Sequence, residues 1–186
     1  TEAVCEQLHL PLQSGSDRIL AAMHRGYNRD RFLTRLEMAR NIVSDLSVST
    51  DIIVGFPGET EDDFLATLEV VEEARFDQAF TFQYSARPGT AAATMDEQLD
   101  KAVVQERFER LIEMQNRISL ESNQALVGRT LEVLVEGPSK KDLTVMTTRS
   151  RGNQTVHAAG GYPAGSYIEI EITKAAPHHL SGKVVS

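Results

Sequence analysis

The chain has 186 residues, of which 41% are hydrophobic and 25% charged, as is usual for a globular protein. Its net charge of −8 argues against a surface that coats nucleic acid throughout, and its single cysteine, Cys5, excludes an internal disulfide framework. No apolar run approaches the roughly 20 residues that span a bilayer, so we expect a cytoplasmic protein with no membrane contact.

The first 126 residues alternate between expected strands and helices. Strands are expected over 4–10, 48–54 and 80–84, and helices over 18–24, from Asn28 or Asp30 to Val43, and over 60–74. Thr60 and the acidic residues after it resemble a capping box. Short connections in this order predict a parallel sheet with helices outside it, either a piece of a (βα) barrel or a small open sheet. A loop over 85–99 and a long amphipathic helix over 100–126 follow, with Val103, Leu111 and Ile118 in its apolar stripe.

The composition changes after Leu126. Short alternating strands are expected over 130–135, 143–146, 167–172 and 182–185, separated by Gly, Pro and Ser. This pattern predicts a small closed all-β barrel of the OB type. We therefore expect two domains, residues 1–126 and 127–186. The second part carries a weakly basic balance, because residues 124–186 contain seven Lys and Arg against five Asp and Glu.

The stretch from Thr50 to Thr60 carries a carboxylate, Asp51, inside an apolar strand that ends in Gly55 and Gly58. A buried carboxylate is costly unless a partner binds it. Ligands of α/β folds bind where parallel strands end. The alternative is a satisfied core carboxylate followed by a tight turn.

A second polar cluster follows the first expected strand. Gln13 and Ser14 offer donors and acceptors beside Gly15, and Arg25 could return to the same sheet edge to hold a ligand carboxylate. Gln13 could instead cap a turn, and Arg25 could simply favour the C-terminal end of a helix. His9 is a candidate base or ligand, although a lone strand histidine is more often packed and hydrogen-bonded.

Four motifs in order resemble the methylthiotransferase branch of the radical S-adenosylmethionine (SAM) enzymes. They are HLPLQSGSD at 9–17, MHRGY at 23–27, DIIVGFPGET at 51–60 and YSARPGTAA at 84–92. Residues 127–142, VGRTLEVLVEGPSKKD, resemble the opening of a TRAM domain. The RPGT and EGPSKKD forms are most similar to the MiaB type, which modifies isopentenylated adenosine beside the tRNA anticodon.

This resemblance implies a partial, TIM-like (βα) radical SAM barrel followed by an OB-like TRAM barrel. It implies SAM and 4Fe-4S clusters as cofactors, a radical that removes hydrogen from adenine C2, and a methylthio group installed there. In such a site Gln13 and Ser14 would lie along the ribose and methionine of SAM, and Arg25 would bind the methionine carboxylate. Asp51 would bind ribose hydroxyls, and Gly55 and Glu59 would line the adenine side.

The cysteines of this family are missing, because no CxxxCxxC motif occurs and Cys5 is alone. We therefore expect the 186 residues to be the C-terminal portion of a longer enzyme, inactive by themselves, without metal ligands, and with a sheet edge that could drive dimerisation. The resemblance also implies tRNA contacts by basic residues of the TRAM domain, namely Arg129, Lys140, Lys141, Arg149 and Arg151. Alternatives are an enzyme for threonylcarbamoyl-adenosine or for a ribosomal protein, and a non-catalytic RNA-binding module.

Overall fold

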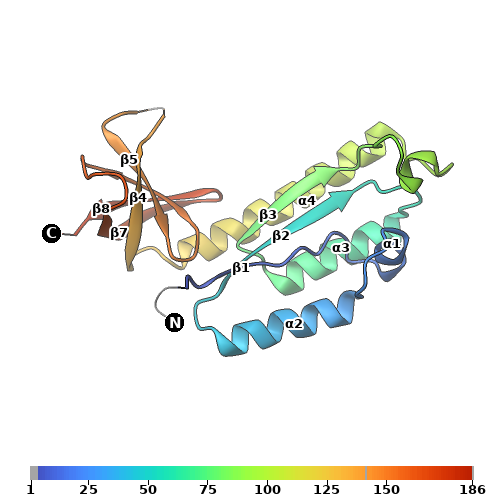
Figure 1. Cartoon of the computed structure of the whole chain (residues 1–186), viewed down its shortest axis with the longest axis horizontal. Coiled ribbons are helices and arrows are strands. Elements are labelled where there is room, and N and C mark those ends of the chain that lie inside the picture. Colours follow the sequence, from blue (N-terminus) through green and yellow to red (C-terminus); the bar gives the residue numbers. More distant parts are fainter. Residues whose placement is uncertain (1–3, 141, 186) are drawn as a thin grey trace. The chain divides into compact units, whose positions relative to one another are not determined.

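Strand β2 (Ser47–Val54) lies at the centre of a three-stranded sheet in the computed structural model, which describes residues 4–140 and 142–185. β1 (Gln7–His9) and β3 (Gln78–Gln83) lie on either side of it. β2 and β3 are parallel, with Asp51 opposite Phe80 and Ile53 opposite Phe82. The predicted parallel sheet is confirmed (Figure 1), although Val4 and Cys5 lie outside β1.

The helices begin where the sequence signals them. Ser16 caps α1 (Asp17–Ala22), Asn28 caps α2 (Arg29–Ile42), and Thr60 with Asp63 forms the predicted capping box of α3 (Glu61–Ala74). A side-chain oxygen at each cap accepts a backbone N–H that the helix itself leaves unpaired. Phe64 and Val71 of α3 are buried, whereas Leu65 is exposed.

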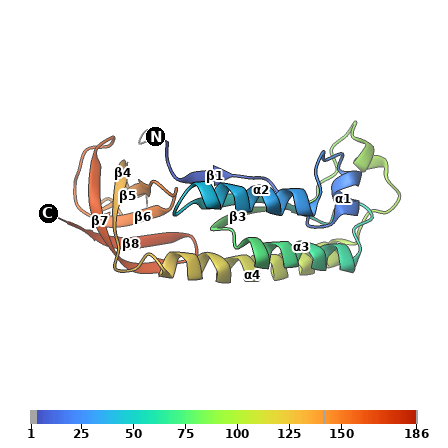
Figure 2. The same cartoon turned by 90° about the horizontal axis from the view of Figure 1, so that it is seen from below.

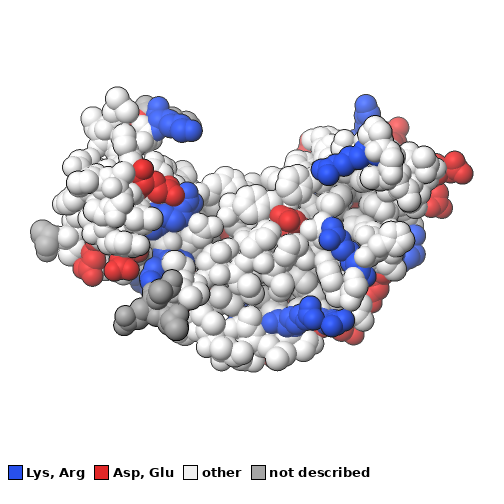
Figure 3. Space-filling model, viewed as in Figure 1, with Lys and Arg blue, Asp and Glu red and all other residues white. Residues whose placement is uncertain are grey.

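One face of the sheet is covered and the other is open. Val48, Ile52 and Val54 are fully or almost fully buried, and Figure 2 shows α3 and α4 on the same side of the sheet. On the opposite face, Phe80 is 45% exposed and Phe82 is 52% exposed. Alternate residues of a strand point to opposite faces, so Asp51 shares the open face with these two rings. Figure 3 shows few charged side chains over β2 and β3.

The long helix α4 (Lys101–Gln124) was predicted. At the start of this helix, however, the buried face is shifted by one residue from the predicted apolar stripe. Val104, Arg107 and Leu111 are buried, whereas Val103 is exposed. A single helical turn, η1 (Ala91–Thr94), interrupts the expected loop before it.

The second half of the chain closes a five-stranded barrel. Its strands are β4 (Thr130–Pro138), β5 (Val145–Ser150), β6 (Thr155–Ala159), β7 (Tyr167–Ala176) and β8 (His179–Val184), in the order β4-β5-β6-β8-β7. The predicted barrel is confirmed, but β6 was missed, and Leu143 lies in a turn rather than in a strand. Inward-facing residues of all five strands form one core, namely Val133, Val135, Met146, Val156, Ala158, Ile170, Ile172 and Leu180.

The chain folds as two compact units. One contains Leu8–Ser44 and Val48–Gln115, and the other contains the described residues up to Gln7, Asp45–Ser47 and the described residues from Asn116 onward. The predicted domain boundary after residue 126 stays a prediction. Among the described residues, no helix has the length and apolarity that crossing a lipid bilayer requires.

Candidate functional site

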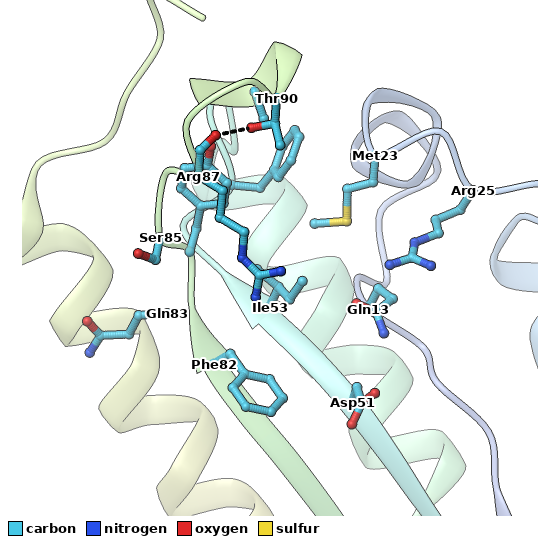
Figure 4. Close-up of a pocket in the computed structure, with 13 residues that line it drawn as sticks. Gln13, Met23, Arg25, Asp51, Ile53, Phe82, Gln83, Ser85, Arg87 and Thr90 are labelled. Atoms are coloured by element: carbon cyan, nitrogen blue, oxygen red, sulfur yellow. Dashed lines mark hydrogen bonds between the residues drawn. The ribbon is translucent and has the colours of Figure 1, made fainter. Parts of the chain in front are cut away.

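A cavity of about 640 Å³ lies at the end of the parallel strands, within the α/β unit. Its walls come from the loop after β1, the turn after α1, strands β2 and β3, and the segment that follows β3 (Figure 4). This size falls within the usual range for small-molecule sites, and the position matches the strand ends at which α/β folds bind ligands. Three of the predicted SAM-binding residues, Gln13, Arg25 and Asp51, line it together.

Gln13 adopts an uncommon backbone conformation at the cavity wall. Its φ angle is 68°, in the left-handed region that non-glycine residues rarely occupy. Its N–H donates to the Asp51 carbonyl at 2.8 Å, and its carbonyl accepts from Ile53 N–H at 2.9 Å. These bonds to β2 hold the strained conformation, which is typical of residues in binding sites.

Asp51 has a partner on the open face of the sheet. His9 Nε2 lies 3.4 Å from Asp51 Oδ2, and His9 Nδ1 lies 3.0 Å from Ser49 Oγ. The His9 ring also packs edge-on against Phe80. His9 is therefore the packed, hydrogen-bonded residue that the sequence favoured, and it orients the Asp51 carboxylate at the cavity edge.

Ser14 points away from the cavity. It is fully buried, its Oγ lies 3.4 Å from Thr67 Oγ1 on α3, and the Gly15 N–H donates to that same Thr67 oxygen at 2.9 Å. A Cβ on Gly15 would lie 2.4 Å from the Ala66 carbonyl oxygen, so only glycine allows this approach. Ser14 thus fastens the loop to α3, and its predicted role in binding SAM stays a prediction.

Gly55 and Glu59 form a closed turn at the end of β2. The Gly55 N–H donates to Glu59 Oε1 at 3.1 Å, and Arg107 Nη1 lies 2.8 Å from the same oxygen. The Glu59 side chain is 2% exposed and that of Arg107 is 6% exposed. Burial raises the pKa of Glu59, against the lowering effect of Arg107 and of the Gly55 N–H. Glu59 therefore fixes the turn, and its predicted contact with the adenine side of SAM remains untested.

Sequence reasoning missed Arg107. The available signal was a basic residue at a buried position of a helix, three residues after Val104 and four before Leu111. The capping role of Asp63 was predicted, but not its burial or the contacts of its carboxylate with Arg18 and Ser16. Burial alone would raise the pKa of Asp63, but these hydrogen bonds outweigh it and hold the pKa well below its usual range.

Four of the predicted tRNA-binding residues lie in the unit that contains the barrel, and three of these four have carboxylate partners. Arg129 pairs with Asp45 at 3.0 Å, Arg149 with Glu136 at 3.1 Å, and Arg151 with Glu6 at 2.7 Å. Lys140 is exposed, and Lys141 lies outside the described residues. Phosphate contacts by the three arginines would require exchange of these partners, so their role stays a prediction.

The donor set of this chain does not fit an iron–sulfur cluster. Such clusters need several thiolates, whereas Cys5 is the single cysteine and is exposed. No group of three or more metal-binding side chains occurs within 4–140 and 142–185.

The cavity does fit SAM. Arg25 offers a fork for a carboxylate, and Asp51 offers acceptors for ribose hydroxyls. Tyr84 also lines the cavity, and its buried hydroxyl has no hydrogen-bond partner within the described residues. A buried polar group without a partner at a cavity wall indicates a place for a ligand.

Family models match both parts of the chain. The radical SAM superfamily model matches residues 1–71, and the TRAM domain model matches residues 124–185. The E. coli coproporphyrinogen III oxidase, a radical SAM enzyme, matches 61% of this chain and 27% of its own, with a TM-score of 0.53 and 22% identity. That likeness concerns the fold alone. The predicted fold, part of a radical SAM barrel followed by a TRAM barrel, is confirmed.

Similar proteins are tRNA-2-methylthio-N(6)-dimethylallyladenosine synthases. Those of Mycobacterium bovis and Mycobacterium tuberculosis are 56% identical over 97% of this chain, and that of Mycobacteroides abscessus is 52% identical over the same share. The chain covers 36%, 34% and 37% of these relatives, so it spans about a third of their length.

Proposed function

Because this chain belongs to the radical SAM methylthiotransferase family, we propose that it serves an enzyme that attaches a methylthio group to C2 of N6-isopentenyladenosine beside the tRNA anticodon. The enzyme acts in the cytoplasm on the anticodon stem-loop. The identity of 56% to synthases of this name supports the choice of substrate. One structural observation carries the proposal, namely that Gln13, Arg25 and Asp51 line the same cavity.

The roles of the cavity residues follow from their chemistry. Arg25 binds the methionine carboxylate of SAM through its planar guanidinium, and Asp51, held by His9, accepts hydrogen bonds from ribose hydroxyls. Gln13 donates and accepts along the same edge. Gly55, Ser14 and Glu59 shape the site through the backbone, because their own polar groups are bound elsewhere in the fold. When bound, SAM supplies the methyl group of the product and, in this family, the hydrogen-abstracting radical.

The cluster ligands must come from polypeptide other than these 186 residues, because Cys5 alone cannot ligate a cluster. We therefore expect the 186-residue chain to be inactive by itself. The exposed edge of β1 or β3 could pair with a second copy, a prediction that light scattering of the purified chain would check.

Mass spectrometry of tRNA nucleosides tests the proposal. A strain that lacks the gene should accumulate N6-isopentenyladenosine and lose its 2-methylthio derivative, and the full-length protein should restore it. Complementation with Asp51→Ala should fail, whereas the matched surface variant Asp30→Ala should succeed. Unchanged isopentenyladenosine derivatives in the deletion strain would refute the substrate, and loss of a methylthio group from threonylcarbamoyl-adenosine would assign the sister activity.

A further inference from the structure

Arg25 and Arg87 both line the cavity, and neither has a carboxylate partner within the described part of the chain. Most other arginines do pair with Asp or Glu, namely Arg18, Arg29, Arg75, Arg107, Arg110, Arg117, Arg129, Arg149 and Arg151. Most guanidinium groups are therefore paired with carboxylates, whereas the two at this cavity are not.

The backbone around Arg87 is held in a turn. Its carbonyl accepts from Thr90 N–H at 3.2 Å and from Thr90 Oγ1 at 2.8 Å, and Gly89 supplies the positive φ of 84° that the turn needs. Figure 4 shows the Arg87 side chain reaching into the cavity from the side opposite Arg25 and Gln13. Arg87 is thus aimed at the ligand space.

The charges at the cavity call for more than one anionic group. Its charged lining consists of Arg25, Arg87 and Asp51, and the Asp51 carboxylate lies beside His9. SAM carries a single carboxylate, which Arg25 binds in the proposed function. The guanidinium of Arg87 on the opposite wall then faces a second anion, which SAM cannot supply.

Phe82 indicates what this second ligand is. Phe82 lies near the end of β3, and its half-exposed ring lines the cavity. Aromatic rings of this kind stack on the unpaired bases of single-stranded RNA. Arginine is well suited to bind phosphate, because its planar fork matches two phosphate oxygens. A nucleotide supplies both features, a base for Phe82 and a phosphate for Arg87.

We propose that Arg87 is a phosphate subsite, which binds a backbone phosphate of the RNA nucleotide whose base enters the cavity beside SAM. This inference rests on the proposed function, since it takes the cavity to hold SAM and RNA together. It assigns Arg87 to substrate binding and Arg25 to cofactor binding, so the two arginines should separate in a binding experiment.

The test uses the full-length protein, an anticodon stem-loop oligonucleotide that carries N6-isopentenyladenosine, and SAM. Fluorescence anisotropy over a range of salt concentrations gives RNA affinity, and calorimetry gives SAM affinity. Arg87→Ala should weaken RNA binding about tenfold or more. It should also reduce the salt slope by about 0.7, the value for one phosphate contact on a single strand, and leave SAM affinity unchanged.

Arg87→Lys should keep the salt slope while losing affinity, because lysine retains the charge but not the fork. Arg35→Ala, an equal charge change at an exposed position outside the cavity, should alter neither measurement. The phosphate subsite is overturned if Arg87→Ala has the RNA affinity and the salt slope of the wild-type protein. It is also overturned if Arg87→Ala loses only affinity for SAM, because Arg87 would then bind the carboxylate of SAM. A wild-type protein that binds no RNA would also overturn it.

The nucleoside measurement separates failure of the subsite from failure of the function. If the deletion strain loses the methylthio group but Arg87→Ala binds RNA normally, only the subsite is wrong. If the methylthio group persists in the deletion strain, the proposed function is wrong as well.

Discussion

The buried ion pair between Glu59 and Arg107 holds the turn that follows β2, and removing one partner should destabilise the fold severely. Arg107→Met keeps most of the apolar stem but leaves the Glu59 carboxylate, which is 2% exposed, without its guanidinium. Breaking a buried pair in this way costs about 3–5 kcal/mol of unfolding free energy. The second contact of Arg107, to Glu61, adds little because that carboxylate is half exposed.

The penalty should depend on pH. Burial raises the pKa of Glu59 even with Arg107 beside it, and without Arg107 it should rise further. A carboxyl group with a raised pKa in the folded state is destabilising once it ionises. The loss of unfolding free energy caused by Arg107→Met is therefore largest above the pKa of Glu59 in the folded state. It shrinks as the pH falls towards 4.5, the ordinary pKa of a glutamate side chain.

Urea unfolding at neutral pH and at about pH 5 measures both effects. The double variant Glu59→Gln, Arg107→Met should recover much of the loss, because an amide oxygen still accepts the Gly55 N–H without a buried charge. Arg110→Met, which removes exposed ion pairs from the same helix, should cost less than about 1 kcal/mol. The reasoning is refuted if Arg107→Met costs no more than Arg110→Met, or if its penalty is equal at both pH values.

Three further substitutions test the packing around the site and the barrel. Asp63→Asn should cost about 1–3 kcal/mol at neutral pH, because the amide nitrogen cannot accept the hydrogen bonds that Oδ2 receives from Arg18 and from the Thr60 N–H. Because the folded pKa of Asp63 is lowered, the difference from wild type should shrink as the pH falls below about 4, and a pH-independent difference in urea unfolding would contradict this. Gly15→Ala should cost about 1–3 kcal/mol because its Cβ meets the backbone of α3, and an unchanged melting temperature would argue against that packing. Gly182→Ala should destabilise the barrel similarly, since its Cβ would lie 2.4 Å from a carbonyl oxygen of β7; wild-type stability would exclude that clash.

Local signals in the sequence predicted the elements that local chemistry determines. Asn28 and the Thr60–Asp63 capping box start their helices as expected, because a cap depends on residues three positions apart. The polar segment with Gln13 and Gly15 was also predicted to follow the first strand, because a strand pattern and the glycine after it are neighbours in the sequence.

The missed features depend on partners that are distant in sequence. β6 (Thr155–Ala159) has small and polar residues and gains its place by parallel pairing with β8. Arg107 is buried because Glu59 lies opposite it, 48 residues earlier. The sequence predicted that Val103 is buried, whereas Val104 is buried instead. This difference also depends on distant residues, since the packing partner decides which side of α4 is buried. Likewise, the sequence placed Asp51 at the site but could not assign His9 as its partner.

The central claim is that Arg25 and Asp51 bind SAM, and calorimetric titration of the full-length protein with SAM tests it most directly. We expect wild-type protein and Arg35→Ala to bind SAM alike. Arg25→Ala should lose about tenfold or more in affinity through loss of its charged hydrogen bonds, and Asp51→Ala should also bind more weakly. Wild-type affinity in both cavity variants would contradict the assignment of the cavity to SAM.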